Sequence, residues 1–131
     1  MKRVFAAFAL LMSTAGHAAP ADDLKVVIAD HWKWWLSVNP VQATTLGVRD
    51  YDDRIGDFSL AAQDRDAKTA DDFVARLNAI PDAGLTPPER TNKGVLARLL
   101  VEQVEANRYG QRMMLFSTYD GWHQGDRKSV V

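Results

Sequence analysis

Three tryptophans within four residues, Trp32, Trp34 and Trp35, constrain the fold of this chain more than any other feature. They lie in a stretch, residues 21–38, whose apolar side chains recur at helical spacing. A helix that is apolar on two sides is normally covered on two sides, and each indole can bury about 150–250 Å². We therefore expect one side of this helix to stay partly uncovered in so short a chain. The two predicted apolar lines are Leu24, Ile28, Trp32, Trp35 and Leu36, and Val27, His31, Trp34 and Val38.

A second, short helix is predicted directly after the tryptophan stretch. Asn39 is a typical N-cap residue, and Pro40 suits the first helical position, where a missing N–H costs nothing. Gly47 is expected to end this helix, over 41–46, in the left-handed conformation. Residues 48–58 then form a predicted turn region.

Two longer helices are predicted from their start signals. Ser59 is the expected N-cap of a helix over 60–80, which Pro81 closes. Thr86-Pro87-Pro88-Glu89 is a capping box that opens a helix over 87–109, and Gly110 ends it. The expected core residues are Ala67, Ala70, Phe73, Val74, Leu77 and Ile80 in the first of these helices, and Val95, Leu96, Leu99, Leu100 and Val104 in the second.

These elements predict an all-α fold with about three longer helices and one short helix. Residues 111–124 show no helical period, and Met114, Leu115 and Phe116 are expected to form a short extended segment.

The first 18 residues have the organisation of a secretory signal peptide. Lys2 and Arg3 precede an apolar run, residues 4–12, that is too short to span a bilayer. Cleavage after Ala18 would place small residues, Gly16 and Ala18, at the two positions that a signal peptidase reads. The alternative is an uncleaved membrane anchor. We expect cleavage and export to the periplasm or the medium, with no membrane contact afterwards.

The last six residues, 126–131, also require separate treatment. The DNA string GATCGGAAGAGCGTCGTG encodes this hexapeptide, resembles the start of a short-read sequencing adapter, and continues with the stop triplet TAG. We therefore expect residues 126–131 to be a sequencing artefact rather than a genuine polar tail. Residues 19–125 remain as one helical segment of a larger domain.

The composition excludes several classes of protein. The chain has no cysteine, so disulfide, thiolate and lipidated-cysteine chemistry are absent. Basic residues at positions 2, 3, 127 and 128 lie in the two predicted ends, so the remainder carries more acidic than basic side chains. Nucleic-acid binding requires a clustered positive patch, and the remainder has none.

No residue type stands in a pattern that predicts a catalytic or metal site. Asp50 and Asp52 match the first ligand positions of an EF-hand loop, but Arg54 stands where a further oxygen ligand is needed. We interpret these aspartates as helix caps or partners of Arg49 and Arg54. His31 is interpreted as a core-edge histidine hydrogen-bonded to a neighbour. We predict no catalytic, cofactor-binding or metal-ligating residue.

The tryptophans have two interpretations. They can line a groove for a sugar or an aromatic ligand, or they can pack against other helices. We favour packing, because the rings fall on helical faces.

An ordered set of short motifs resembles a bacterial family known as domain of unknown function 885. No single motif is specific, but together they cover most of residues 19–125. They are Trp32-x-Trp34, Asn39-Pro40, Ala43-Thr44, Leu46-Gly47, Tyr51-Asp52, Asp57-x-Ser59, Leu85 to Arg90, and Arg112 to Trp122.

The resemblance implies a longer, mostly helical, exported protein similar to zinc metallopeptidases. Its HExxPGHH-type motif, in which two histidines bind Zn²⁺ and a glutamate activates water, is absent from this sequence. We therefore expect a non-catalytic N-terminal fragment without a cofactor, whose partner is the missing C-terminal part of its own chain. Zinc and a peptide substrate belong only to the intact parent. The alternatives are a complete small periplasmic binding or adaptor domain, and an intact enzyme of unknown type.

Overall fold

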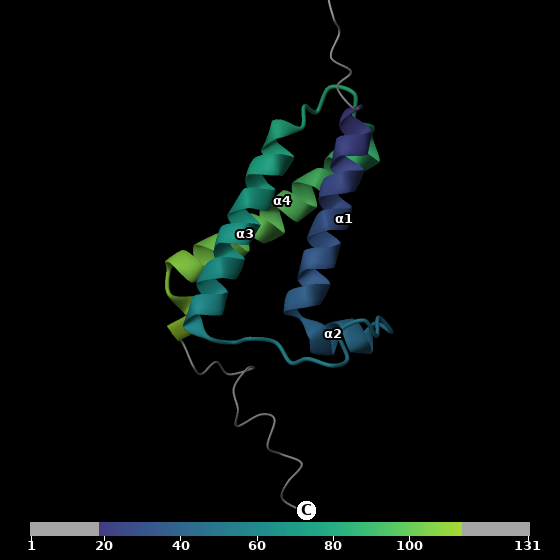
Figure 1. The fold of residues 1–131 in the computed structure, drawn as a ribbon. Helices are drawn as coiled ribbons and strands as arrows, with labels where there is room; N and C mark the ends of the chain where they lie inside the picture. Colours follow the sequence, from purple (N-terminus) through teal and green to yellow (C-terminus); the bar gives the residue numbers. More distant parts are fainter. Residues whose placement is uncertain (1–18, 114–131) are drawn as a thin grey trace, which may run out of the picture.

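The computed structural model describes residues 19–113, which form four α-helices and one 3₁₀ turn (Figure 1). No strand occurs within this range, so the predicted all-α fold is confirmed. The predicted extended segment at 114–116 lies outside the described residues, as do the predicted signal peptide and residues 126–131. The elements are α1 (Pro20–Val38), α2 (Pro40–Thr45), α3 (Leu60–Ala79), α4 (Pro87–Arg108) and η1 (Gln111–Met113).

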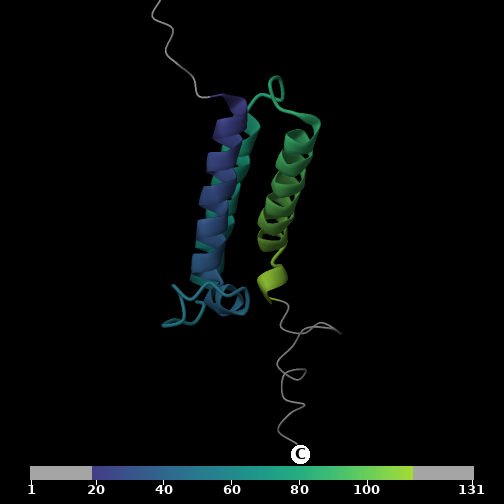
Figure 2. The ribbon, with the colours of Figure 1, turned by 90° about the vertical axis from the view of Figure 1, so that its right-hand side faces the viewer.

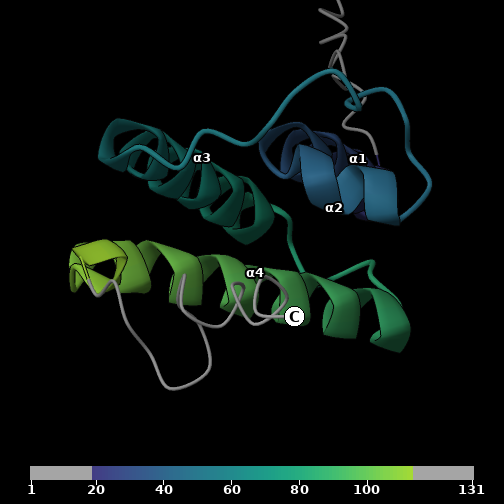
Figure 3. The ribbon, with the colours of Figure 1, turned by 90° about the horizontal axis from the view of Figure 1, so that it is seen from below.

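The helices lie in two layers. α1 and α3 run antiparallel in one layer, and α4 crosses behind them in the other (Figures 1 and 2). Viewed along the bundle, α4 forms a layer of its own below α1, α2 and α3 (Figure 3). α4 packs against α3 far more extensively than against α1. The second half of α1, which carries the tryptophans, therefore has no helix of the other layer against it.

Local side-chain chemistry explains where α3 and α4 begin. The Ser59 Oγ accepts a hydrogen bond from the Ala62 backbone N–H at 3.1 Å, as an N-cap residue does. The Thr86 backbone N–H and hydroxyl both donate to the Glu89 carboxylate at 2.8 Å. Both predicted start signals are confirmed, including the capping box.

The connection between α1 and α2 differs from the prediction. Asn39 does not cap α2 with its side chain; its Nδ2 donates to the Trp35 carbonyl oxygen at 2.9 Å, beside its own backbone N–H at 3.0 Å. The last carbonyls of a helix lack partners within the helix, so Asn39 satisfies the end of α1 instead. The expected end of α2 is confirmed: Gly47 has φ +84°, and the Val48 N–H donates to the Ala43 carbonyl oxygen at 2.9 Å in a Schellman-type closure.

The core lies between α1, α3 and α4, and the linker before α4 contributes to it. In α3 the predicted apolar stripe is confirmed, and Leu77 is fully buried. In α4 the prediction was partly wrong, because Val95 is 54 % and Leu99 59 % exposed. The buried core cluster consists of Leu24, Val27, Ala70, Phe73, Leu77, Ile80, Leu85 and Leu100.

The exposure of Val95 and Leu99 follows from the layer arrangement. Leu96, Leu100 and Val104 form one line at four-residue spacing, and this line faces the other layer. Val95 and Leu99 form the adjacent line, about 100° around the helix. Only one line is covered, because a single helix, α3, packs along most of α4.

None of the helices within residues 19–113 combines the length and the apolar character needed to cross a bilayer.

Candidate functional site

The aromatic residues of α1 divide into an inner and an outer group. His31 and Trp34 face α3, where the His31 ring meets the Phe73 ring edge-on at a centroid distance of 5.5 Å. Trp32 and Trp35 form the outer group. Their rings stack with an interplanar angle of 7° and a centroid distance of 5.4 Å. Trp32 is 47 % exposed, so the expected uncovered side of α1 is confirmed.

The structure corrects the interpretation of His31. Within residues 19–113 its ring makes aromatic contacts with Trp34 and Phe73 instead of the expected hydrogen bond to a neighbour. Partial burial against these rings lowers the pKa of His31 below its ordinary value, because an apolar environment disfavours the charged imidazole. This histidine is a packing residue at the edge of the core.

The acidic turn after α2 forms local ion pairs, as expected. Asp52 accepts hydrogen bonds from the Thr44 hydroxyl at 2.6 Å and from Arg49 at 3.4 Å. Asp53 pairs with Arg54 at 3.2 Å, and the Arg54 guanidinium lies over the Tyr51 ring. Pairing with Arg49 and Arg54 is therefore confirmed for Asp52 and Asp53, whereas Asp50 forms no such pair within residues 19–113.

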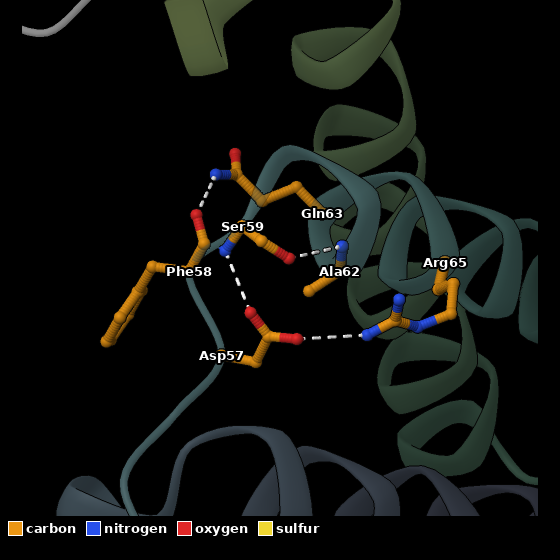
Figure 4. Close-up of polar contacts among 6 residues, drawn as sticks. All are labelled: Asp57, Phe58, Ser59, Ala62, Gln63 and Arg65. Atoms are coloured by element: carbon orange, nitrogen blue, oxygen red, sulfur yellow. Dashed lines mark hydrogen bonds and ion pairs between the residues drawn. The ribbon is translucent and has the colours of Figure 1, made fainter.

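A second polar cluster joins this turn region to the start of α3 (Figure 4). The Asp57 carboxylate accepts from the Ser59 backbone N–H at 2.9 Å and from Arg65 at 3.2 Å. Gln63 donates to the Phe58 carbonyl oxygen at 3.0 Å. The Ser59 hydrogen bonds, more than Arg65, hold the pKa of Asp57 below its ordinary value. These contacts fix the loop against α3, while the Phe58 side chain points away from the helix.

Two hollows meet at Asp66 on α3. One, of about 310 Å³, lies between α3 and α4 and is bounded by Gln63, Asn107 and Gln111 among others. The other, of about 180 Å³, lies between the end of α1, the loop and α3. Burial raises the pKa of the Asp66 carboxyl above its ordinary value. Carboxylate and carboxamide groups therefore line this end of the bundle.

Asp66 was missed by the sequence reasoning, although a signal for it exists. It lies four residues after Ala62 and four before Ala70, both buried. A carboxyl within an apolar stripe at helical spacing is unusual, because burial disfavours the charged form.

No group of three histidine, cysteine or acidic side chains within residues 19–113 is arranged to hold a metal ion. The described residues therefore do not fit a zinc site, which needs about three or four such ligands. That the chain as a whole carries no catalytic, cofactor-binding or metal-ligating residue stays a prediction, and His123 lies outside the described range.

The sequence matches a protein family, described as "Bacterial protein of unknown function (DUF885)", over residues 40–130. The chain belongs to the DUF885 family. The match begins at the first residue of α2 and includes α3, α4 and the polar cluster around Asp57. Of the motifs that carried the resemblance, Trp32-x-Trp34 and Asn39 precede the DUF885 match. No curated protein and no solved structure shows significant similarity to the chain.

Proposed function

We propose that residues 19–125 form a non-catalytic helical segment of an exported DUF885 protein that hydrolyses peptides with zinc. In this proposal the helices flank or roof a substrate channel and pack against a further part of the same protein. The zinc ligands lie outside residues 19–113, which offer no suitable group. No catalytic step is assigned to the described side chains.

The observation that carries this proposal is the amount of apolar surface that the described helices leave uncovered. Trp32, Val95 and Leu99 are each about half exposed or more, and they lie on α1 and α4, in different layers. Large apolar side chains that a fold leaves exposed on more than one helix are expected to be covered by another protein surface. The alternative, a complete small binding or adaptor domain, predicts that large apolar side chains are covered.

The proposal is tested with the purified chain, using a dye that binds exposed apolar surface and zinc titration in parallel. We expect strong dye binding that weakens in a Trp32→Ser, Leu99→Ser double variant, and we expect no stoichiometric zinc binding. The matched control is Lys33→Ser with Arg98→Ser, which removes exposed charged side chains from the same helices and leaves dye binding unchanged.

Tight zinc binding or peptide hydrolysis by the purified chain would overturn the non-catalytic assignment. A monomer that melts cooperatively and binds no dye would favour the small-domain alternative. For the parent, the genomic DNA after the Gly125 codon is decisive, because the proposal requires an open frame that reaches a HExxPGHH-type motif.

Export has its own test. The full chain is expressed in a bacterial host, and the N-terminus of the protein found in the periplasmic fraction is sequenced. We expect this protein to begin at Ala19. Retention of residues 1–18 in the membrane fraction would favour the uncleaved anchor.

A further inference from the structure

The start of α3 and the end of α4 form one end of the bundle, which carries several exposed apolar side chains. α3 begins and α4 ends side by side, and the Asn107 side chain donates to Asp64 at 3.2 Å (Figures 1 and 3). The exposed residues at this end are Phe58 (79 %), Leu60 (47 %), Tyr109 (74 %) and Met113 (63 %).

The same end is hollowed. The larger hollow lies between α3 and α4, and its wall includes Gln111, two residues before the last described residue. Gln63, Gln103, Ala67 and Ala106 are among the residues that line it. Side-chain amides can pair with the backbone groups of a segment lying in the hollow, because each offers both a donor and an acceptor.

The chain itself supplies an occupant of matching chemistry. Met114, Leu115 and Phe116 follow Met113 directly, and Tyr119 and Trp122 come soon after. Asp120 is the only charged residue among 114–122. Gly110, at φ +71°, turns the backbone after α4 so that η1 lies at this end. A segment of nine residues has a reach of up to about 30 Å, so the exposed residues beside its origin are accessible to it.

We propose that residues 114–122 pack across the end of the bundle formed by the start of α3 and the end of α4, covering Leu60 and Tyr109 and entering the hollow beside Asp66. This docking goes beyond the proposed function and does not depend on it, because the occupant is a segment already present in this chain. It leaves Trp32, Val95 and Leu99 for another partner.

The natural absence of cysteine allows a direct test by paired substitution. We expect that the full chain carrying Leu60→Cys and Phe116→Cys forms an intramolecular disulfide under mild oxidation, seen as a monomer of altered mobility. The matched control carries Leu99→Cys and Phe116→Cys. Leu99 is similarly exposed but lies on the part of α4 that this end does not include, so the control pair is expected to stay reduced.

A second measurement is included because two cysteines can lie close together and still fail to form a disulfide when their geometry is unfavourable. The single variant Leu60→Cys is labelled with a thiol reagent in the full chain and in a chain that ends after Met113. We expect labelling several-fold slower in the full chain, whereas the control Val95→Cys reacts at the same rate in both.

Three results would overturn the proposal. Equal labelling rates at position 60 in the two chains would show that the segment does not cover this end. Disulfide-linked dimers without the intramolecular product would assign the surface to a second copy. Equal cross-linking of the Leu60 and Leu99 pairs would show that residues 114–122 have no defined docking position.

Discussion

The Lys93 ammonium nitrogen lies 2.6 Å from the carbonyl oxygen of Ile80, which is the residue that caps the end of α3. The same nitrogen donates to Asp82 at 2.6 Å, and the Lys93 side chain is only 14 % exposed. The terminal carbonyls of a helix need partners from outside the helix. Lys93 provides one, and it thereby ties the end of α3 to the first turns of α4.

We expect Lys93→Met to lower the free energy of unfolding by about 1–2 kcal/mol, because a hydrogen bond from a charged donor to a half-buried carbonyl is lost. The control is Arg98→Met, which removes an exposed pair with Glu102 and is expected to cost less than about 0.5 kcal/mol. Urea unfolding followed by circular dichroism measures both. Equal effects would show that Lys93 does not tie the two helices together.

The different burial of two leucines predicts that their substitution by alanine lowers stability by very different amounts. Leu77 is fully buried between α3 and its neighbours, and Leu99 is 59 % exposed on α4. We expect Leu77→Ala to cost about 2–5 kcal/mol through lost contacts and a cavity, and Leu99→Ala about 0.5 kcal/mol or less. Thermal unfolding monitored at the helical signal distinguishes them. A larger effect at position 99 would contradict the arrangement of α4 described above.

The capping carboxylates predict a loss of stability in acid. Hydrogen bonds from Thr86 lower the pKa of Glu89, and the Ser59 hydrogen bonds lower that of Asp57. Such a group stabilises the fold above its unfolded pKa, about 4, and this contribution is lost as the pH falls through the lower folded value. Glu89→Gln should therefore reduce the difference between the urea midpoints at pH 7 and pH 3. Glu105→Gln, on an exposed part of α4, is the control and should leave that difference unchanged.

The lowered pKa of His31 predicts a second pH dependence of folding stability, at higher pH than that of the carboxylates. Burial lowers its pKa in the folded chain, so the fold disfavours the charged imidazole. His31 then does not reduce the free energy of unfolding above its unfolded pKa, about 6.5. The free energy of unfolding falls as the pH drops below that value. An NMR titration of the His31 ring should give a pKa below the ordinary value of about 6.5. His31→Gln should remove this pH dependence, whereas a His31 pKa at or above 6.5 would contradict its position beside Trp34 and Phe73.

Local sequence signals predicted where most of the helices lie in the chain. They predicted little about which side chains pack between the two layers. Ser59, Thr86 and Glu89 act within three residues of their partners, so their roles were visible in the sequence. The role of Asn39 was not, because this residue lies both at the end of α1 and at the start of α2, and its side chain could serve either helix. The lines through Leu96 and through Leu99 are equally apolar, and only the position of α3 selects the first.

The same limit applies to the candidate site. Pairing of Asp52 and Asp53 with nearby arginines was predictable, because both partners lie in one turn. The meeting of the two hollows at Asp66 was not, because Gln111 and Ser37 reach them from elements distant in the chain.

Sequence alone determined the helical class, the helix starts and the excess of apolar side chains on α1, because capping and periodicity are properties of neighbouring residues. Tertiary structure decided which apolar line of each helix is covered, and where Trp32, Leu99 and Asp66 stand relative to solvent. Packing joins residues far apart in the chain, and α4 lies against α3 rather than along the tryptophan half of α1.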